Sequence, residues 1–435
     1  MGPVRLGSGP VGDPFKGEEE IMSTFMPFRA LRPHRRYVEE VASYPYDVLE
    51  EDEARKIVEK NPNSFLRVEK SEIDLPPKTD PNDERAFIAA KNNLERLKKE
   101  GIVFQEEKAC FYVYGQKKGD HTQYGIVGSV SLAEYDSGEV KKHERTRPDK
   151  ERERVRNIDA AGANTGLVFL VYRARESIDR IVDGIVNAAP EYDFVFENGV
   201  HHLAWVVSDE KTIKAIQREF LRVDALYIAD GHHRVAAAAA VARMRRERNP
   251  AHRGTEEYNF FVGALFPHTQ ARIMDYNRVV KGLNGLSQEE LLRRIESNFE
   301  VTPHFQAKFP SRPHEFGMYL KGKWLRLRMK EERIGQRELI ETLDVWLLQD
   351  QLLSPVLGIQ DPTTDKRIKF IGGIRGVAEL ERLINSGEFD VAFSMVPPAL
   401  KDLMDISDAG QIMPPKSTWF EPKLLSGVFV HLLES

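Results

Sequence analysis

One stretch of the chain constrains the fold more than any other, an apolar run that passes through a glycine into an alanine-rich segment. Residues 223–229 are strand-like, Asp230-Gly231-His232-His233-Arg234 follow, and residues 235–242 are all alanine or valine. Glycine adopts turn conformations that other residues avoid, so this order predicts a buried strand, a tight turn and a helix. Helix and strand signals continue to alternate after Phe28, which favours a mixed α/β chain over a helix bundle or a β-sandwich.

The polar residues at this turn are suited to binding a phosphate. The first amides of a new helix have no partner inside the helix, and together with the helix dipole they attract anions. Gly231, His232, His233 and Arg234 would surround such an anion, and Asp230 is able to hold a divalent cation. The structural alternative is a helix capped by Asp230, which would need only one of these residues.

Composition narrows the class of protein further. The chain has 435 residues and a formal net charge of −5, and its length suggests two or three domains. Cys110 is its single cysteine, which excludes a disulfide within one chain and multi-cysteine zinc sites, and fits a reducing cytoplasm. No apolar run approaches the roughly 18 residues of a membrane-spanning helix. The mild acidity argues against bulk nucleic-acid binding, and the oligomeric state is left open.

The first residues differ from the rest of the chain. Residues 1–21 are rich in glycine and proline and lack the pattern of a secretory signal. We predict a disordered extension over residues 1–27. The codons of Gly17-Glu18-Glu19-Glu20 can resemble a bacterial ribosome-binding site, so we hypothesise that Met22 is the true start. An ordinary flexible terminus is the alternative.

The remaining chain carries several recognisable helix and turn signals. Asp80-Pro81 predicts a capped helix that continues to Gly101, and Lys321-Gly322-Lys323 predicts a hairpin turn. Ser287 with Glu290 is typical of a capping box at a helix start. We place a domain boundary near residue 285, between residues 28–285 and a mixed α/β part over residues 286–435, and expect both parts to contribute to one site.

Two further segments concentrate groups suited to phosphate chemistry. Residues 139–156 are highly charged and include His143 and Glu144 in a stretch that should bend before Pro148; a solvated charged face is the alternative. The order strand, glycine turn, helix recurs at Gly372-Gly373-Ile374-Arg375-Gly376, where successive glycines can form an anion-binding nest beside Arg375. The alternative there is a glycine turn required only by packing.

A proline-bracketed loop near the end completes the set of candidates. Residues 413–423 combine Lys416, Ser417 and Thr418 with Trp419 and Phe420. A lysine and two hydroxyls in a rigid loop are typical of a ligand-binding segment.

Taken together, these motifs resemble those of the prokaryotic domain of unknown function 1015 family. The resemblance covers nearly everything after Phe28, including Pro45-Tyr46-Asp47-Val48. That family is similar to ParB-like and sulfiredoxin-like nucleotide-binding domains and to the archaeal free L-serine kinases. The kinases share the Asp230–Arg234 turn, an element matched by Pro415–Thr418, and one matched by Arg32-Pro33-His34. The resemblance implies a ParB-like nucleotide-binding core in residues 28–285.

One departure from the serine kinases affects the expected mechanism. Their general base is a glutamate that follows the Pro-His pair, whereas this chain has Arg35, which cannot accept a proton. We expect another carboxylate to take this role, with Asp47 the first candidate and Glu144 the second. For Asp47, a cap of a helix near Glu51 is the structural alternative.

These observations predict a cytoplasmic kinase that transfers a phosphoryl group from ADP or ATP, with Mg²⁺, to a small hydroxylated metabolite. The resemblance implies free L-serine as the acceptor. Asp47 or Glu144 would take the hydroxyl proton, assisted by His143 or His233. A phosphohydrolase and a non-catalytic ParB-like nucleotide switch are the alternatives.

Overall fold

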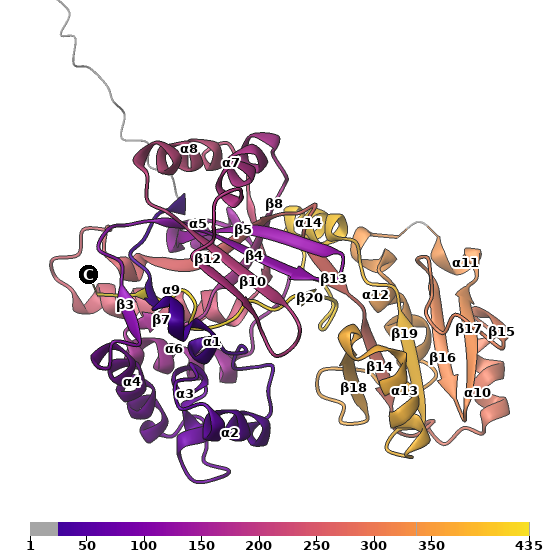
Figure 1. Ribbon diagram of the computed structural model, residues 1–435. Coiled ribbons are helices and arrows are strands. Elements are labelled where there is room, and N and C mark those ends of the chain that lie inside the picture. Colours follow the sequence, from indigo (N-terminus) through magenta and orange to yellow (C-terminus); the bar gives the residue numbers. More distant parts are fainter. Residues whose placement is uncertain (1–24, 336, 435) are drawn as a thin grey trace, which may run out of the picture.

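The computed structural model describes residues 25–335 and 337–434 and shows two bodies, each built around one β-sheet (Figure 1). Helices and strands alternate in both bodies, so the fold is mixed α/β, as the sequence predicts. Residues 1–24 of the predicted extension, which include Met22, lie outside the described residues. Within this part of the chain, no helix is long and apolar enough to cross a membrane.

The first body contains a nine-stranded sheet with the order β6-β11-β8-β12-β5-β4-β10-β9, and β1 pairs with β5. Most neighbours are antiparallel, while β6/β11 and β8/β12 are parallel. The strands are β1 Phe25–Met26, β4 Phe111–Lys118, β5 His121–Ser131, β6 Val140–Lys141, β8 Val168–Tyr172, β9 Tyr192–Val195, β10 His201–Val207, β11 Leu226–Asp230 and β12 Phe260–Pro267.

Helices surround this sheet, and α7 and α8 lie on the side away from α2, α3 and α4 (Figure 1). The helix α9 carries a buried row of alanines and valines, and these small side chains pack with sheet residues such as Val168 and Ile228. The helices are α1 Val38–Val41, α2 Glu51–Lys60, α3 Leu66–Glu69, α4 Glu84–Lys99, α5 Leu132–Ser137, α6 Pro148–Ala161, α7 Glu176–Val186, α8 Glu210–Phe220 and α9 His232–Arg248.

The second body contains a six-stranded sheet with the order β15-β17-β16-β19-β14-β18. The predicted hairpin at Lys321-Gly322 is confirmed between β16 and β17, and both residues have positive φ (45° and 81°), as a tight primed turn requires. The strands are β14 Tyr276–Val280, β15 Phe299–Pro303, β16 Glu315–Leu320, β17 Lys323–Met329, β18 Ile368–Gly372 and β19 Val391–Met395, and the helices are α10 Gln288–Ile295, α11 Glu331–Ile334, α12 Asp344–Leu348, α13 Gly376–Asn385 and α14 Leu400–Asp408.

The chain crosses between the two bodies more than once. β14 belongs to the second sheet although it precedes residue 285, and the last residues return to the first body. There β20 (Trp419–Glu421) pairs with β13 (Arg272–Met274), and β21 (His431–Leu432) pairs with β7 (Ala163–Asn164). The division at residue 285 therefore stays a prediction.

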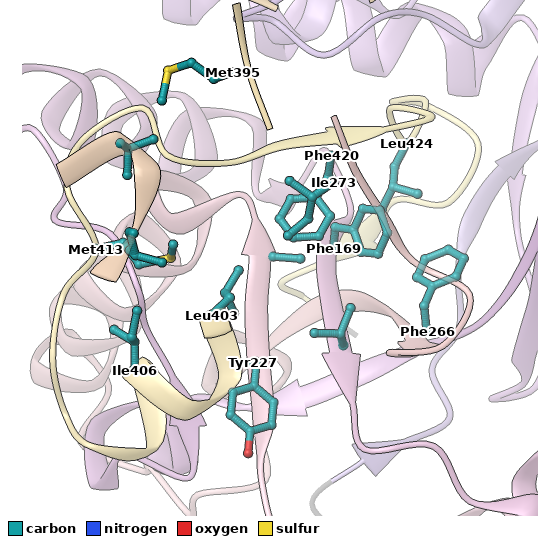
Figure 2. Close-up of a cluster of buried hydrophobic side chains, with 14 of the residues drawn as sticks. Phe169, Tyr227, Phe266, Ile273, Met395, Leu403, Ile406, Met413, Phe420 and Leu424 are labelled. Atoms are coloured by element: carbon teal, nitrogen blue, oxygen red, sulfur yellow. The ribbon is translucent and has the colours of Figure 1, made fainter. Parts of the chain in front are cut away.

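A buried apolar cluster joins the bodies (Figure 2). Phe169 and Phe266 come from the first sheet, Met395 comes from the second, and Phe420 comes from the returning segment. Because such a seam excludes water, it favours a fixed arrangement of the two bodies over free hinging. Side chains that the two bodies present at this junction can thus share one site.

The structure corrects three local predictions. Phe25 is buried and paired in β1, so the predicted disordered extension does not reach residue 27. The helix expected from Asp80-Pro81 begins later, because the side chain of Asp83 accepts the amide of Arg85 and caps α4. The cap of α2 is Glu50, so Asp47 has no capping role.

A buried carboxyl in the second body yields a stability prediction. Burial raises the pKa of Asp344 to about 7, and its Oδ1 accepts the amide of His314 at 2.8 Å. An unfolded aspartate ionises near pH 4, so Asp344 stabilises the fold at pH 4 and loses that contribution as the pH rises through 7. We expect Asp344→Asn to raise the melting temperature at pH 8 by about 2–8 °C, corresponding to about 1–3 kcal/mol.

The measurement is thermal unfolding by circular dichroism at pH 4 and pH 8. At pH 4 the variant and the parent should melt together, because the protonated carboxyl resembles the amide. Asp350→Asn, at an exposed site, is the matched control. Equal melting temperatures of Asp344→Asn and the parent at both pH values would contradict the assignment.

Candidate functional site

A cavity of about 270 Å³ lies where β11 ends, and both bodies contribute to its lining. The first body provides the turn at Tyr46, the charged segment near Glu144 and the start of α9, the second provides Tyr276 at the start of β14, and the returning segment provides the loop near Lys416. The lining residues are Pro45, Tyr46, Asp47, Val48, Glu144, Arg147, Lys150, Leu167, Phe169, Asp230, Gly231, His232, His233, Arg234, Tyr276, Lys416, Thr418, Trp419, Lys423 and Leu424.

The predicted strand, glycine turn and helix form one wall of the cavity. Gly231 has φ 100°, a left-handed conformation that favours glycine, and it occupies the N-cap position of α9 without a side-chain hydrogen bond to the helix. The alternative in which Asp230 caps this helix is therefore wrong. The amides of His232 and His233, the first two of α9, have no acceptor within the helix and lie at the cavity, where the helix dipole favours an anion.

Asp230 is held by a lysine from the returning loop. The Nζ of Lys423 lies 2.8 Å from Oδ2 of Asp230 and 4.5 Å from the centre of the Trp419 ring. Although burial opposes ionisation, the ammonium of Lys423 lowers the pKa of Asp230 to about 2. Both groups are charged at neutral pH, so the cavity contains a positioned cation and a positioned carboxylate.

Arg234 lines the cavity but directs donors into the protein. Its Nη1 donates to the carbonyl of Leu167 at 2.8 Å, and its Nη2 lies 3.4 Å from Oε2 of the buried Glu69. Thr165 and Ser426 also donate to Glu69, at 2.9 and 2.6 Å. The predicted phosphate role of Arg234 therefore competes with a structural one that the sequence does not reveal.

Three histidines surround the turn. His232 and His143 are buried with their rings in edge-to-face contact at 4.5 Å, and His143 Nε2 lies 3.1 Å from Thr418 Oγ1. Burial lowers the pKa of His143 to about 4 and that of His232 and His233 below the usual value. The imidazoles of His143 and His232 are thus neutral at pH 7, and His233 Nδ1 is buried without a hydrogen-bond partner among the described residues.

Both candidate bases line the cavity. Asp47 is exposed at its rim, and Glu144 is partly buried, which raises the pKa of Glu144. The ammonium of Lys416 partly offsets this rise. The predicted Asp47 and Glu144 are therefore brought together, although 97 positions separate them in the chain.

The cavity lining carries more basic than acidic side chains. Arg147 and Lys150, at the start of α6, add to the lysines of the returning loop, and the Lys416 ammonium lies 6.0 Å from the Tyr276 ring centre. Arg147 and Lys150 belong to the segment 139–156, whose high charge marked it as a candidate in the sequence. No sequence feature indicated that Tyr276 lines the cavity. This charge excess favours an anionic ligand.

Some predicted residues do not line the cavity. The glycine turn at Gly372 has the expected order of strand and helix, but Gly373 donates its amide to the carbonyl of Asp275 at 2.7 Å. A Cβ at Gly373 would collide with the side-chain carboxylate of Asp275, so packing accounts for this glycine, and its amide is not free for the predicted anion nest. Arg375 is exposed outside the lining, His143 lies behind it, and buried Ser417 donates to the carbonyl of Pro414.

The site contains a carboxylate that is suited to a magnesium ion. Mg²⁺ prefers oxygen ligands and is usually held by one or two carboxylates together with phosphate oxygens and water. Asp230 is anionic and partly open to the cavity, so its carboxylate is suited to that contact.

Comparison with solved structures finds distant likenesses. A free serine kinase in complex with AMP has a TM-score of 0.32 at 12% identity and covers 68% of this chain and 86% of that chain. SbnI with a C-terminal truncation, from Staphylococcus aureus, has a TM-score of 0.37 at 10% identity, covering 69% and 85%. A conserved hypothetical protein from Pyrococcus furiosus has a TM-score of 0.30 at 13% identity, covering 69% and 94%.

No curated protein matches the chain. The profile of the family described as protein of unknown function (DUF1015) matches residues 25–346, well over half of the 435 residues. The matched range includes the charged segment, Asp230 to Arg234 and Tyr276, so it contains most of the cavity lining. The chain therefore belongs to the DUF1015 family of proteins of unknown function.

Proposed function

We propose that this protein is a phosphotransferase that moves a phosphoryl group from ADP or ATP to a small hydroxylated metabolite. The observation that carries the proposal is the meeting, in one cavity, of the open start of α9 with Lys416 and Lys423 from the returning loop. Phosphoryl transfer requires mainly alignment of donor and acceptor and neutralisation of charge on the phosphate oxygens.

In this proposal the donor phosphates lie against the first amides of α9 and between the two lysines. The fixed amides and ammonium groups stabilise the charge that develops on the transferred phosphoryl group. A bound Mg²⁺, in contact with Asp230, would supply further neutralisation of the phosphate charge. The carboxylate of Asp230 partly neutralises the charge of the Lys423 ammonium, so this ammonium contacts Asp230 and the bound phosphate at the same time.

The acceptor hydroxyl lies between the phosphate and the rim of the cavity. Its oxygen forms the new bond to phosphorus as the bond to the leaving nucleotide oxygen breaks, and its proton passes to a carboxylate. Asp47 is the first candidate for this base, Glu144 the second, and His233 has an unpartnered nitrogen with which to assist. Free L-serine is the leading acceptor because the Asp230–Arg234 and Pro415–Thr418 elements resemble those of the free L-serine kinases.

The test is phosphorus NMR of the purified protein with Mg²⁺, L-serine, and ADP or ATP. New O-phosphoserine would support the proposal and identify the donor. Inorganic phosphate released without dependence on serine would instead support a phosphohydrolase. Nucleotide binding without turnover would support a nucleotide switch, and both of these results would overturn the kinase assignment.

The base assignment leads to its own prediction. Asp47→Asn removes the proton acceptor but preserves size, so we expect kcat to fall by about 10²- to 10⁴-fold with little change in nucleotide affinity. Steady-state kinetic assays give kcat, and calorimetric titration gives the nucleotide affinity. Asp52→Asn, at an exposed position of α2, is the matched control and should behave as the parent. If Asp47→Asn retains full kcat, Asp47 is not the base and Glu144 becomes the first candidate.

A further inference from the structure

One group of three potential metal ligands lies close together in the part of the chain that the structure describes. A nitrogen from each of His143 and His232 and a carboxylate oxygen of Glu144 all lie within 4.8 Å of one another. His143 and Glu144 follow β6, and His232 is the first residue of α9, so two separate elements bring the group together. We propose that His143, Glu144 and His232 bind a divalent transition-metal ion.

The distances suit an ion after a small contraction. Zinc–nitrogen and zinc–oxygen bonds of about 2.0–2.2 Å place neighbouring ligand atoms roughly 3–4 Å apart, so the three groups need to move by only about 1 Å. The edge-to-face arrangement of the two imidazole rings, with centroids 4.5 Å apart, keeps the His143 and His232 rings close without stacking them. Glu144 and His232 both line the cavity.

An independent observation points to a ligand at this place. The Nδ1 atom of His143 is buried and makes no hydrogen bond of normal geometry among the described residues, although the backbone of Ile228 lies beside the ring, while Nε2 of the same ring lies 3.1 Å from Thr418 Oγ1. Buried polar atoms are nearly always paired, because leaving one unpaired is costly. A metal-binding histidine commonly has one nitrogen held by a second residue while the other faces the ion, and Thr418 is placed for the first of these contacts.

The chemistry of the donor set decides the class of ion. Two imidazoles and one carboxylate favour ions such as Zn²⁺, Co²⁺ or Fe²⁺ over Mg²⁺, which prefers oxygen ligands. Three protein ligands leave at least one coordination position for water or a substrate oxygen, as in catalytic rather than structural sites. Because Glu144 lines the cavity, that position is reached from the cavity.

This site goes beyond the proposed phosphotransferase and does not depend on it. It differs from the magnesium contact at Asp230, which uses a carboxylate and nucleotide oxygens. If Glu144 is committed to the ion, Asp47 is left as the carboxylate for proton transfer. The metal site is therefore tested without nucleotide, so that its failure and the failure of the kinase assignment give different results.

The experiment is a Co²⁺ titration of the full chain after treatment with a chelator, followed by visible absorption. We expect one Co²⁺ per chain with the absorption bands of imidazole coordination, displacement by one equivalent of Zn²⁺, and no displacement by a large excess of Mg²⁺. Glu144→Gln should weaken Co²⁺ binding by at least about 10- to 100-fold. His232→Gln should do the same, provided that circular dichroism shows it folded.

His304→Asn is the matched control, because His304 is exposed and the asparagine tolerates its positive φ of 58°. It should bind Co²⁺ as the parent does. Binding of equal strength by the parent and by folded Glu144→Gln would overturn the proposal. So would the absence of stoichiometric Co²⁺ binding by the parent, or displacement of the bound Co²⁺ by Mg²⁺.

Discussion

Lys423→Met should lower kcat/KM for phosphoryl transfer by about 10²- to 10³-fold, the usual effect of removing one positioned group that stabilises developing charge. The ammonium of Lys423 is largely buried, lies 2.8 Å from Asp230 and faces the cavity that the start of α9 also lines. Its loss removes a cation from the proposed phosphate position and leaves Asp230 as an uncompensated negative charge there. Both changes oppose the approach of a phosphate.

The measurement is a steady-state assay with the donor and acceptor identified by phosphorus NMR. Lys323→Met, in the exposed hairpin of the second body, makes the same substitution away from the cavity and should retain parental kinetics. The Asp230 side chain is 42% exposed, so the variant should remain folded, which circular dichroism would check. A folded Lys423→Met protein with parental kcat/KM would remove Lys423 from the proposed mechanism.

The local structure at the site could be predicted from the sequence because its signals are local. An apolar run, one glycine and a row of alanines specify β11, the turn at Gly231 and α9 without information from elsewhere in the chain. The small side chains also explain why α9 packs closely on the sheet. The same local logic correctly predicted the hairpin at Lys321-Gly322 and the strand and helix around Gly372.

A local sequence pattern does not show whether a glycine turn lies at the cavity. The turn at Gly372 has the same order of elements as the turn at Gly231, but its strand lies in the other sheet and its glycine is required by Asp275. Tyr276 lines the cavity without any sequence signal, because only the pairing of distant strands brings it there. Distinguishing two similar turns therefore required the tertiary structure.

The direction in which the Arg234 side chain points could not be predicted from the sequence either. Arg234 was expected to face a phosphate because arginine binds phosphate well and follows the glycine turn. In the structure it is paired with Glu69, which is 165 positions earlier in the chain. A buried carboxylate that accepts hydrogen bonds from three distant segments leaves no periodic or compositional signal.

This buried carboxylate gives the largest stability effect that we expect. The side chain of Glu69 is 1% exposed and accepts hydrogen bonds from Thr165 and Ser426 in addition to pairing with Arg234. Glu69→Ala leaves the largely buried guanidinium of Arg234 without its carboxylate, and removing one partner of a buried ion pair costs about 3–5 kcal/mol. We expect the melting temperature of the first body to fall by about 6–15 °C.

Thermal unfolding followed by circular dichroism and by calorimetry would measure this change, since calorimetry separates the two bodies if they unfold in steps. Glu59→Ala, on the exposed face of α2, makes the same substitution without a buried partner and should change the melting temperature little. Glu69→Gln retains an acceptor for the two hydroxyls but loses the charge, so its melting temperature should lie between those of the parent and Glu69→Ala. If Glu69→Ala has the same melting temperature as Glu59→Ala, the fold does not need the contact between Arg234 and this carboxylate. The guanidinium of Arg234 would then be free to bind a ligand in the cavity.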